Sequence, residues 1–206
     1  RLVGYRYKAH NGRGEKVKPK GYLLMALGNA MISDQIIKYL RPFAQAGYDV
    51  YIYDYRGYGN SEGNRRINAF IEDYKELSVF LNASYDRSVF YGISLGGVII
   101  LNVIGSGIDF DAAVIDSSPS RLSNYGCPET IDSVKNLPSD SSKLMVITGA
   151  KDKVLNESMT KGLREEAKLK GARTLIGEQF AHPFMDSREI RKARLKIIMQ
   201  FLFDRG

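Results

Sequence analysis

The stretch SVFYGISLGGVIILNVI, residues 88–104, joins an apolar strand to an apolar helix through a short glycine-containing turn. Ser88–Ile93 has the continuous apolar character of a strand that is buried on both faces. Leu95–Ile104 is a longer apolar run, which predicts a buried helix. A Gly-x-Ser-x-Gly motif centred on Ser94 lies at the junction. A position between a strand and a helix is the structural context that this motif requires if its serine is a nucleophile.

The spacing of this motif suits a serine that acts as a nucleophile. Gly92 and Gly96 have no side chains, so the strand and the helix can approach each other closely. The tight turn lifts the Ser94 hydroxyl above the sheet edge and directs the positive end of the helix at the reacting oxygen. We therefore predict Ser94 as the nucleophile and the Leu95 backbone amide as one oxyanion donor.

Strand and helix patterns alternate over the rest of the chain. Strands are predicted at Leu2–Ala9, Tyr22–Leu27, Val50–Tyr55, Ala112–Asp116, Leu144–Thr148 and Arg173–Ile176. Helices are predicted over residues 34–46, 67–82 and 157–170, and in a last segment that buries Ile190, Ala193, Ile197, Ile198, Phe201 and Leu202 and leaves its Arg and Lys outside. The alternation predicts a single α/β domain over residues 1–206, with a mostly parallel sheet covered by helices on both faces.

Residues 118–142 interrupt this alternation. The segment is rich in Ser, Pro, Asn and Asp and connects two predicted strands at the sheet end where ligands bind in such folds. Two interpretations remain open, a small cap or binding loop and a plain surface loop. Cys127 within it is not predicted as a nucleophile, because no base accompanies it in the sequence.

A serine nucleophile needs a base, and the chain has two histidines. His182 lies in the loop before the last helix, at the same sheet end as Ser94, whereas His10 precedes the main strands. We predict His182 as the base, oriented by Asp152, which follows the strand 144–148. Asp116 is the rival for this carboxylate role, and Asp186 is interpreted as a cap of the last helix.

The loop after the strand 22–27 should supply the second oxyanion donor. Gly28 lets the backbone turn there, and the amide of Asn29, or that of Ala30, would point at the oxygen. Met31 and Tyr58 are predicted to line the acyl pocket.

Asp54 and Arg56 follow a predicted strand and resemble catalytic groups in type. We interpret them as a paired turn that holds the strand end in place.

Composition and charge exclude several classes of protein. A hydrophobic content of 44% with 26% charged residues excludes a disordered chain, a collagen and a coiled coil. One cysteine excludes an intramolecular disulfide and a cysteine-cluster metal site, and no apolar run reaches the length of a membrane span. No Walker loop or dinucleotide fingerprint is present. We expect no nucleic-acid partner, since the basic residues lie near the two ends and not among aromatics in the middle.

The basic ends leave two interpretations. They are either solvated surfaces or a site of peripheral contact with an acidic membrane or partner. The compartment stays unknown, although a soluble cytoplasmic domain is favoured. Because the sequence starts at Arg1 and not at Met, a targeting or anchor segment could precede it.

Taken together, these motifs resemble the α/β-hydrolase superfamily over nearly the whole chain. Residues 54–61 resemble the D-x-R-G-x-G-x-S segment of that family, and the GNA, GISLGG, GAKDKV and AHPF loops follow in the family order. The combination is most similar to the small, nearly capless serine hydrolases, which include acyl-protein thioesterases and peptidase-like members. The resemblance implies a triad of Ser94, His182 and Asp152, with no metal and no cofactor. One departure is Leu27 before Gly28, where that branch usually has a histidine.

The expected activity is hydrolysis of a carboxylic ester or thioester through an acyl-enzyme, with a small molecule or an acylated protein as substrate. Two alternatives remain open, a peptidase-like hydrolase and a non-catalytic protein that binds an acyl ligand on the same fold.

Overall fold

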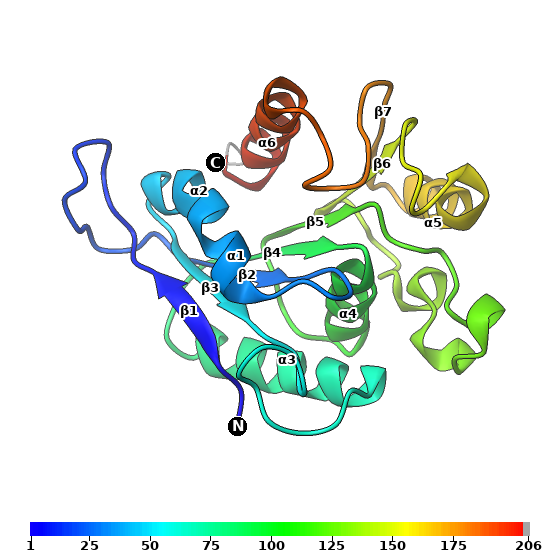
Figure 1. The fold of residues 1–206 in the computed structure, drawn as a ribbon, viewed down its shortest axis with the longest axis horizontal. Helices are drawn as coiled ribbons and strands as arrows, with labels where there is room; N and C mark the ends of the chain where they lie inside the picture. The colour runs from blue at the N-terminus through cyan, green and yellow to red at the C-terminus, as the bar shows by residue number, and fades with distance from the viewer. Residues whose placement is uncertain (204–206) are drawn as a thin grey trace.

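In the computed structural model, which describes residues 1–203, the strands form one mostly parallel sheet (Figure 1). The spatial order is β1-β3-β2-β4-β5-β6-β7, and β1 alone runs antiparallel, to β3. The strands are β1 (Gly4–Tyr7), β2 (Tyr22–Ala26), β3 (Asp49–Tyr53), β4 (Ser88–Ile93), β5 (Ala112–Asp116), β6 (Leu144–Gly149) and β7 (Arg173–Gly177). The predicted fold class is therefore confirmed.

Helices cover both faces of this sheet (Figure 1). One face carries α1 (Ser33–Ile36), η1 (Ile37–Leu40), α2 (Arg41–Gln45) and α6 (Arg188–Phe203). The other carries α3 (Ile67–Asn82), α4 (Leu95–Gly105) and α5 (Glu157–Leu169). Every residue of β2, β4 and β5 is buried as a result, which explains why these strands are apolar without alternation.

The single helix predicted over residues 34–46 is wrong, because the structure divides it into α1, η1 and α2. Pro42 is the physical reason. Its ring and missing N–H do not fit the interior of an α-helix, but they fit the first turn of α2, where Pro42 lies. Gly47, with a φ of +92°, then turns the chain into β3.

The last helix also differs from the prediction, which placed its Arg and Lys outside and Ala193 inside. In α6 the buried residues are Arg194, Ile198, Phe201 and Leu202, whereas Ala193 is exposed. Arg194 is only 3% exposed. A guanidinium tolerates such burial only where carboxylates compensate its charge, and those partners lie elsewhere in the chain.

The segment 118–142 contains three short 3-10 helices, η2 (Ser123–Tyr125), η3 (Glu129–Ile131) and η4 (Ser133–Asn136). Asp132 ties them together, since its buried carboxylate accepts hydrogen bonds from the Ser123 amide at 2.8 Å and hydroxyl at 2.7 Å. The pKa of Asp132 is held below its ordinary value because these bonds and nearby Arg121 outweigh the effect of burial.

None of the helices in residues 1–203 has both the length and the apolar character needed to cross a lipid bilayer.

Candidate active site

Ser94 occupies the turn between β4 and α4 in a conformation that serine rarely adopts, with φ +53° and ψ −117°. Close packing on both sides enforces it. A Cβ on Gly92 would lie 2.6 Å from the Gly96 carbonyl oxygen, and one on Gly96 would lie 2.0 Å from the Ala26 carbonyl oxygen. The Ser94 N–H donates to the Asp116 carbonyl at 2.9 Å. Strain maintained by the surrounding structure in this way is typical of functional positions.

His182 and Asp152 meet across two loops at the carboxyl end of the sheet. His182 Nδ1 lies 2.8 Å from Asp152 Oδ2, and both side chains are buried. The second oxygen, Oδ1, accepts the amides of Val154 at 2.8 Å and Leu155 at 2.9 Å. Burial alone would raise the pKa of Asp152, but the hydrogen bonds from His182 and these amides hold it below its ordinary value. An ionised carboxylate fixed in this way selects the tautomer of His182 that carries its proton on Nδ1.

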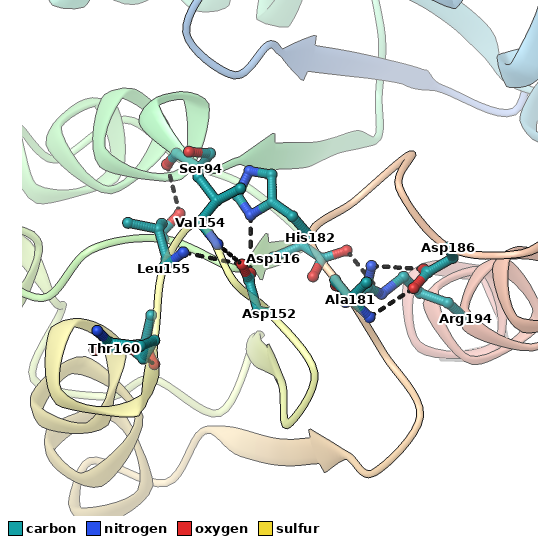
Figure 2. A network of polar contacts seen from close by, with 12 residues as sticks. Ser94, Asp116, Asp152, Val154, Leu155, Thr160, Ala181, His182, Asp186 and Arg194 are labelled. Carbon is teal, nitrogen blue, oxygen red and sulfur yellow. Dashed lines mark hydrogen bonds and ion pairs between the residues drawn. The ribbon is translucent and has the colours of Figure 1, made fainter.

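The imidazole of His182 points toward Ser94 from its loop, with Asp152 on its other side (Figure 2). Within residues 1–203 no hydrogen bond joins the Ser94 hydroxyl to this ring. Such contacts are often long in a free site and tighten only when a substrate is bound. The arrangement can therefore move a proton from the hydroxyl to Nε2 while Asp152 stabilises the charged ring.

The two predicted oxyanion donors lie beside the same pocket as Ser94. Leu95 is the first residue of α4, so its N–H has no partner within the helix. The Asn29 side chain accepts a hydrogen bond from the Tyr58 hydroxyl at 2.6 Å, which fixes the loop that carries the Asn29 amide.

The loop that follows β2 is held by contacts from the segment after β3. The Tyr55 hydroxyl donates to the Leu27 carbonyl at 2.6 Å, and Asp54 Oδ1 accepts the Ser33 amide at 2.6 Å. Burial raises the pKa of Tyr55 well above its ordinary value, so the hydroxyl remains a donor. Two hydrogen bonds from the segment after β3 thus hold this loop at Leu27 and at Ser33.

A pocket of about 360 Å³ adjoins Ser94. Tyr58 is among its lining residues, whereas Met31 is not and packs its sulfur against Gly28. The segment 118–142 contributes Pro119, Leu122 and Tyr125 to the wall. That segment therefore borders the candidate site instead of lying apart from it.

Asp116, the rival carboxylate, is fully buried and makes no hydrogen bond to His182. Its Oδ2 accepts the Tyr91 hydroxyl at 3.1 Å and lies 3.6 Å from Arg194 Nε. Burial raises the pKa of Asp116, against the opposing effects of Arg194 and the Tyr91 hydroxyl. The geometry thus joins Asp152, and not Asp116, to the histidine.

Arg194 and Asp186 hold the loop that carries His182 (Figure 2). The sequence did not lead us to predict this role for either residue. Arg194 donates to the Ala181 carbonyl at 2.9 Å and to Asp186 Oδ2 at 2.8 Å. Asp186 Oδ1 in turn accepts the Ala181 amide at 2.7 Å, so both backbone polar groups of Ala181 are held. The available signal was an arginine spaced four residues from Ile190 and from Ile198 on an apolar helix face. The interpretation of Asp186 as a cap of the last helix is therefore wrong, since its two oxygens bind Ala181 and Arg194. The Ser187 hydroxyl accepts the Ile190 amide at 3.4 Å instead.

Asp54 and Arg56 do not pair with each other, which corrects the prediction of a paired turn. Arg56 forms an ion pair with Asp73 of α3, with its Nε 2.6 Å from Oδ2, whereas Asp54 accepts the Ser33 amide. Each anchors the segment after β3 to a different neighbour, so both have structural roles.

His10 and Cys127 do not line the pocket beside Ser94. His10 stacks on Tyr7 near the start of the chain, and Cys127 is a half-buried free thiol. No group of three or more His, Cys, Asp or Glu side chains in the described part of the chain could hold a metal ion.

Comparison with solved structures supports the fold. Monoacylglycerol lipase of Paleococcus ferrophilus superimposes with a TM-score of 0.73 at 15% identity, covering 99% of this chain and 100% of that one. A soluble variant of monoglyceride lipase of Saccharomyces cerevisiae superimposes with a TM-score of 0.75 at 12% identity, covering 98% of this chain and 91% of the lipase. Esterase 2 of Thermogutta terrifontis superimposes with a TM-score of 0.76 at 16% identity, covering 100% of this chain and 90% of the esterase. At these identities the likeness establishes the α/β-hydrolase fold alone.

Comparison at the level of sequence gives the family. No curated protein sequence matches the chain significantly. A family model described as serine aminopeptidase, S33, matches residues 17–134, which is more than half of the chain and includes the Ser94 turn. With its strand order and its Gly-x-Ser-x-Gly turn, the chain belongs to this serine aminopeptidase S33 family of α/β-hydrolases.

Proposed function

We propose that this protein is a serine hydrolase that cleaves carboxylic esters or thioesters through Ser94, His182 and Asp152. The observation that carries the proposal is the strained Ser94 turn facing a histidine whose Nδ1 lies 2.8 Å from a buried aspartate. A nucleophile, a base and a group that orients the base are the three parts of such a mechanism.

In the proposed reaction, His182 Nε2 takes the Ser94 proton while Oγ attacks the substrate carbonyl carbon. The Leu95 and Asn29 amides stabilise the negative charge that develops on the carbonyl oxygen. His182 then gives the proton to the departing alcohol or thiol, which leaves an acyl-enzyme on Ser94. Water activated by His182 releases the carboxylic acid and restores the serine.

The walls of the pocket favour an acyl group as the part of the substrate that binds there. Ile67, Phe70, Leu122, Leu155 and Met159 contribute apolar surface beside Ser94. Three solved structures of the same fold are named as lipases or esterases, which favours esters among the candidate substrates. We propose small acyl esters or an acylated protein as substrates.

Peptide hydrolysis is the second candidate, because the matching family is described as serine aminopeptidase. The two functions share the same nucleophile and differ in the leaving group. They are distinguished by offering an ester and an aminoacyl anilide to the same preparation.

The decisive experiment compares the wild type with Ser94→Ala and with Ser84→Ala, an exposed serine that serves as the matched control. Initial rates are measured on 4-nitrophenyl esters from acetyl to palmitoyl, on palmitoyl-CoA and on an aminoacyl 4-nitroanilide. Labelling by a fluorophosphonate probe runs alongside. We expect Ser94→Ala to lose labelling and at least about 10³-fold in kcat, while Ser84→Ala retains both.

The pattern of rates identifies the substrate class. Fast turnover of esters or of palmitoyl-CoA supports the proposal, and the chain-length profile sizes the pocket. Turnover of the anilide alone would favour the peptidase. A wild type that neither labels nor turns over would refute the hydrolase and favour the non-catalytic binding protein.

A further inference from the structure

A second cavity, of about 370 Å³, is lined by residues of η1, α2 and α6. The helices α2 and α6 lie on the same face of the sheet (Figure 1). It shares no lining residue with the pocket beside Ser94. Its volume falls within the range of pockets that hold small ligands, about 300–1,000 Å³. None of the residues assigned to the proposed reaction, which are Ser94, His182, Asp152, Asn29 and Leu95, lines it.

The inner wall of this cavity is apolar. Leu40, Pro42, Phe43, Leu195 and Ile198 supply most of it. Leu40, Phe43 and Ile198 belong to the hydrophobic core, so the cavity reaches the core surface between the helices. Such a wall favours an aliphatic or aromatic group over water.

The rim of the cavity is cationic. Lys38, Arg41, Arg188, Arg191 and Lys192 surround it, and none of them forms an ion pair with a carboxylate in residues 1–203. Asp186 is the one acidic residue in the lining, and Arg194 already engages it at 2.8 Å. The rim therefore has uncompensated positive charge that an anion would neutralise.

One wall of the cavity is strained. Phe184 has a φ of +68°, a conformation rare for a bulky side chain, and its ring packs 5.6 Å from that of Tyr39 in η1. Lys38 and Arg191 lie over the Tyr39 ring at 5.2 and 5.1 Å. An outlier of this kind is energetically unfavourable and is found at ligand clamps among other functional sites.

We propose that this cavity binds an amphipathic anion, a single acyl chain that ends in a carboxylate. The chain would lie against the apolar wall formed by α2 and α6, and the carboxylate would meet the cations of the rim. An apolar wall alone would accept any lipid, and a cationic rim alone any anion, so the combination selects this class. The site is separate from Ser94 and goes beyond the proposed function.

The test uses the absence of tryptophan from the chain. Gln45→Trp places a single fluorescent reporter at an exposed position of the cavity lining. This variant is titrated with dodecanoate below its micelle-forming concentration, and with dodecanol and dodecyltrimethylammonium at the same concentrations. Calorimetry on the wild type repeats the titration without the reporter. No step depends on turnover, so failure of the hydrolase proposal would leave this test intact.

Two charge-reversal variants complete the design. Lys38→Glu/Arg191→Glu removes cations from the rim, and Lys168→Glu/Arg173→Glu is the matched control on exposed positions of α5 and β7. We expect saturable binding of dodecanoate that weakens with salt and weakens by about tenfold or more in the rim variant, while the control binds as the parent does.

Three results would overturn the proposal. The first is the absence of saturable binding of dodecanoate by both fluorescence and calorimetry. The second is equal binding of the cationic or neutral amphiphile, or of dodecanoate by the rim variant. The third is a response to vesicles of anionic phospholipid without any to monomeric dodecanoate, which would indicate a membrane-contact surface instead of a pocket.

Discussion

Single residues at the candidate site are held in conformations that only their neighbours make stable. Ser94 is the main example, since its positive φ is unfavourable for serine in isolation. The tight contacts around Gly92 and Gly96 leave the turn no wider alternative. The backbone that carries the hydroxyl is thereby fixed in the free protein, and in the proposed reaction this would reduce the entropy lost on reaching the transition state.

In the proposed mechanism Asp152 orients His182, and substitution by an amide of the same shape tests this role. Asp152→Asn should preserve the fold but favour the wrong tautomer of His182, and lower kcat by about 10³–10⁴-fold with little change in KM. Ester hydrolysis and circular dichroism measure the two effects. Asp140→Asn, at an exposed loop position, is the control and should leave kcat unchanged. A kcat within a factor of about three of the wild type would remove Asp152 from the proposed triad.

At the scale of elements, α6 both closes one face of the sheet and positions the loop that carries His182. Arg194 links the two functions, because its guanidinium reaches the Ala181 carbonyl, Asp186 and, at 3.6 Å, Asp116. It also lies 4.4 Å from the centre of the Phe180 ring. A shift of α6 would therefore move the peptide directly before the histidine.

Removing this arginine should affect stability and catalysis separately. Arg194→Met leaves two buried carboxylates without their cation, and we expect the free energy of unfolding to fall by about 3–5 kcal/mol. If the protein remains folded, kcat should fall by about tenfold to a hundredfold, because a displaced loop misplaces His182. Urea unfolding measures the change in the free energy of unfolding, and ester hydrolysis measures the change in kcat.

The controls separate positioning from packing. Arg194→Lys keeps the charge and should restore part of the kcat, whereas Lys196→Met, on the exposed side of α6, should change neither quantity. Loss of stability with kcat and KM unchanged would mean that Arg194 serves the fold alone.

At the scale of the whole molecule, Asp49 ties together three segments that are distant in sequence. From the start of β3 its carboxylate accepts the Arg6 guanidinium at 2.6 Å, the Ala9 amide at 2.8 Å and the Tyr85 hydroxyl at 2.6 Å. Burial alone would raise its pKa, but these hydrogen bonds hold the pKa of Asp49 below its ordinary value. The antiparallel strand β1 is thus anchored to the loop after α3.

The sign of the pH effect follows from this lowered pKa. Because the folded pKa lies below the unfolded value of about 3.9, the carboxylate stabilises the fold above that pH. The contribution is lost as pH falls through the folded pKa. Asp49→Asn should lower the free energy of unfolding by about 1–3 kcal/mol at pH 7, and the difference should shrink below about pH 4.

Urea unfolding at several pH values measures this difference. The exposed Asp86→Asn should match the wild type throughout. A difference between Asp49→Asn and the wild type that stays constant from pH 7 to pH 3 would show that the charge of Asp49 is not the source of its effect.

The parts of this protein that depend on residues close in sequence were predictable from sequence. α3, β4 and β5 have the predicted bounds, because an apolar period or a continuous apolar run defines each of them. The Gly-x-Ser-x-Gly turn is also local, since the clash that demands Gly92 involves residues four and five positions away. The chain order of strands and loops was enough to direct Ser94, Asp152 and His182 to one sheet edge, and their roles remain a proposal.

Other features depend on partners that only the tertiary structure brings together. Arg194 is buried beside Asp116, which lies 78 positions earlier in the chain, and no local pattern predicts that proximity. For the same reason, Asp54 accepts a hydrogen bond from the Ser33 amide, and Arg56 pairs with Asp73 and not with Asp54. The cationic cavity exists because α2 and α6, at opposite ends of the chain, lie on one face of the sheet. Local sequence determines backbone conformation and the periodicity of burial, whereas the charge partners of a buried side chain depend on which distant segments the fold places beside it.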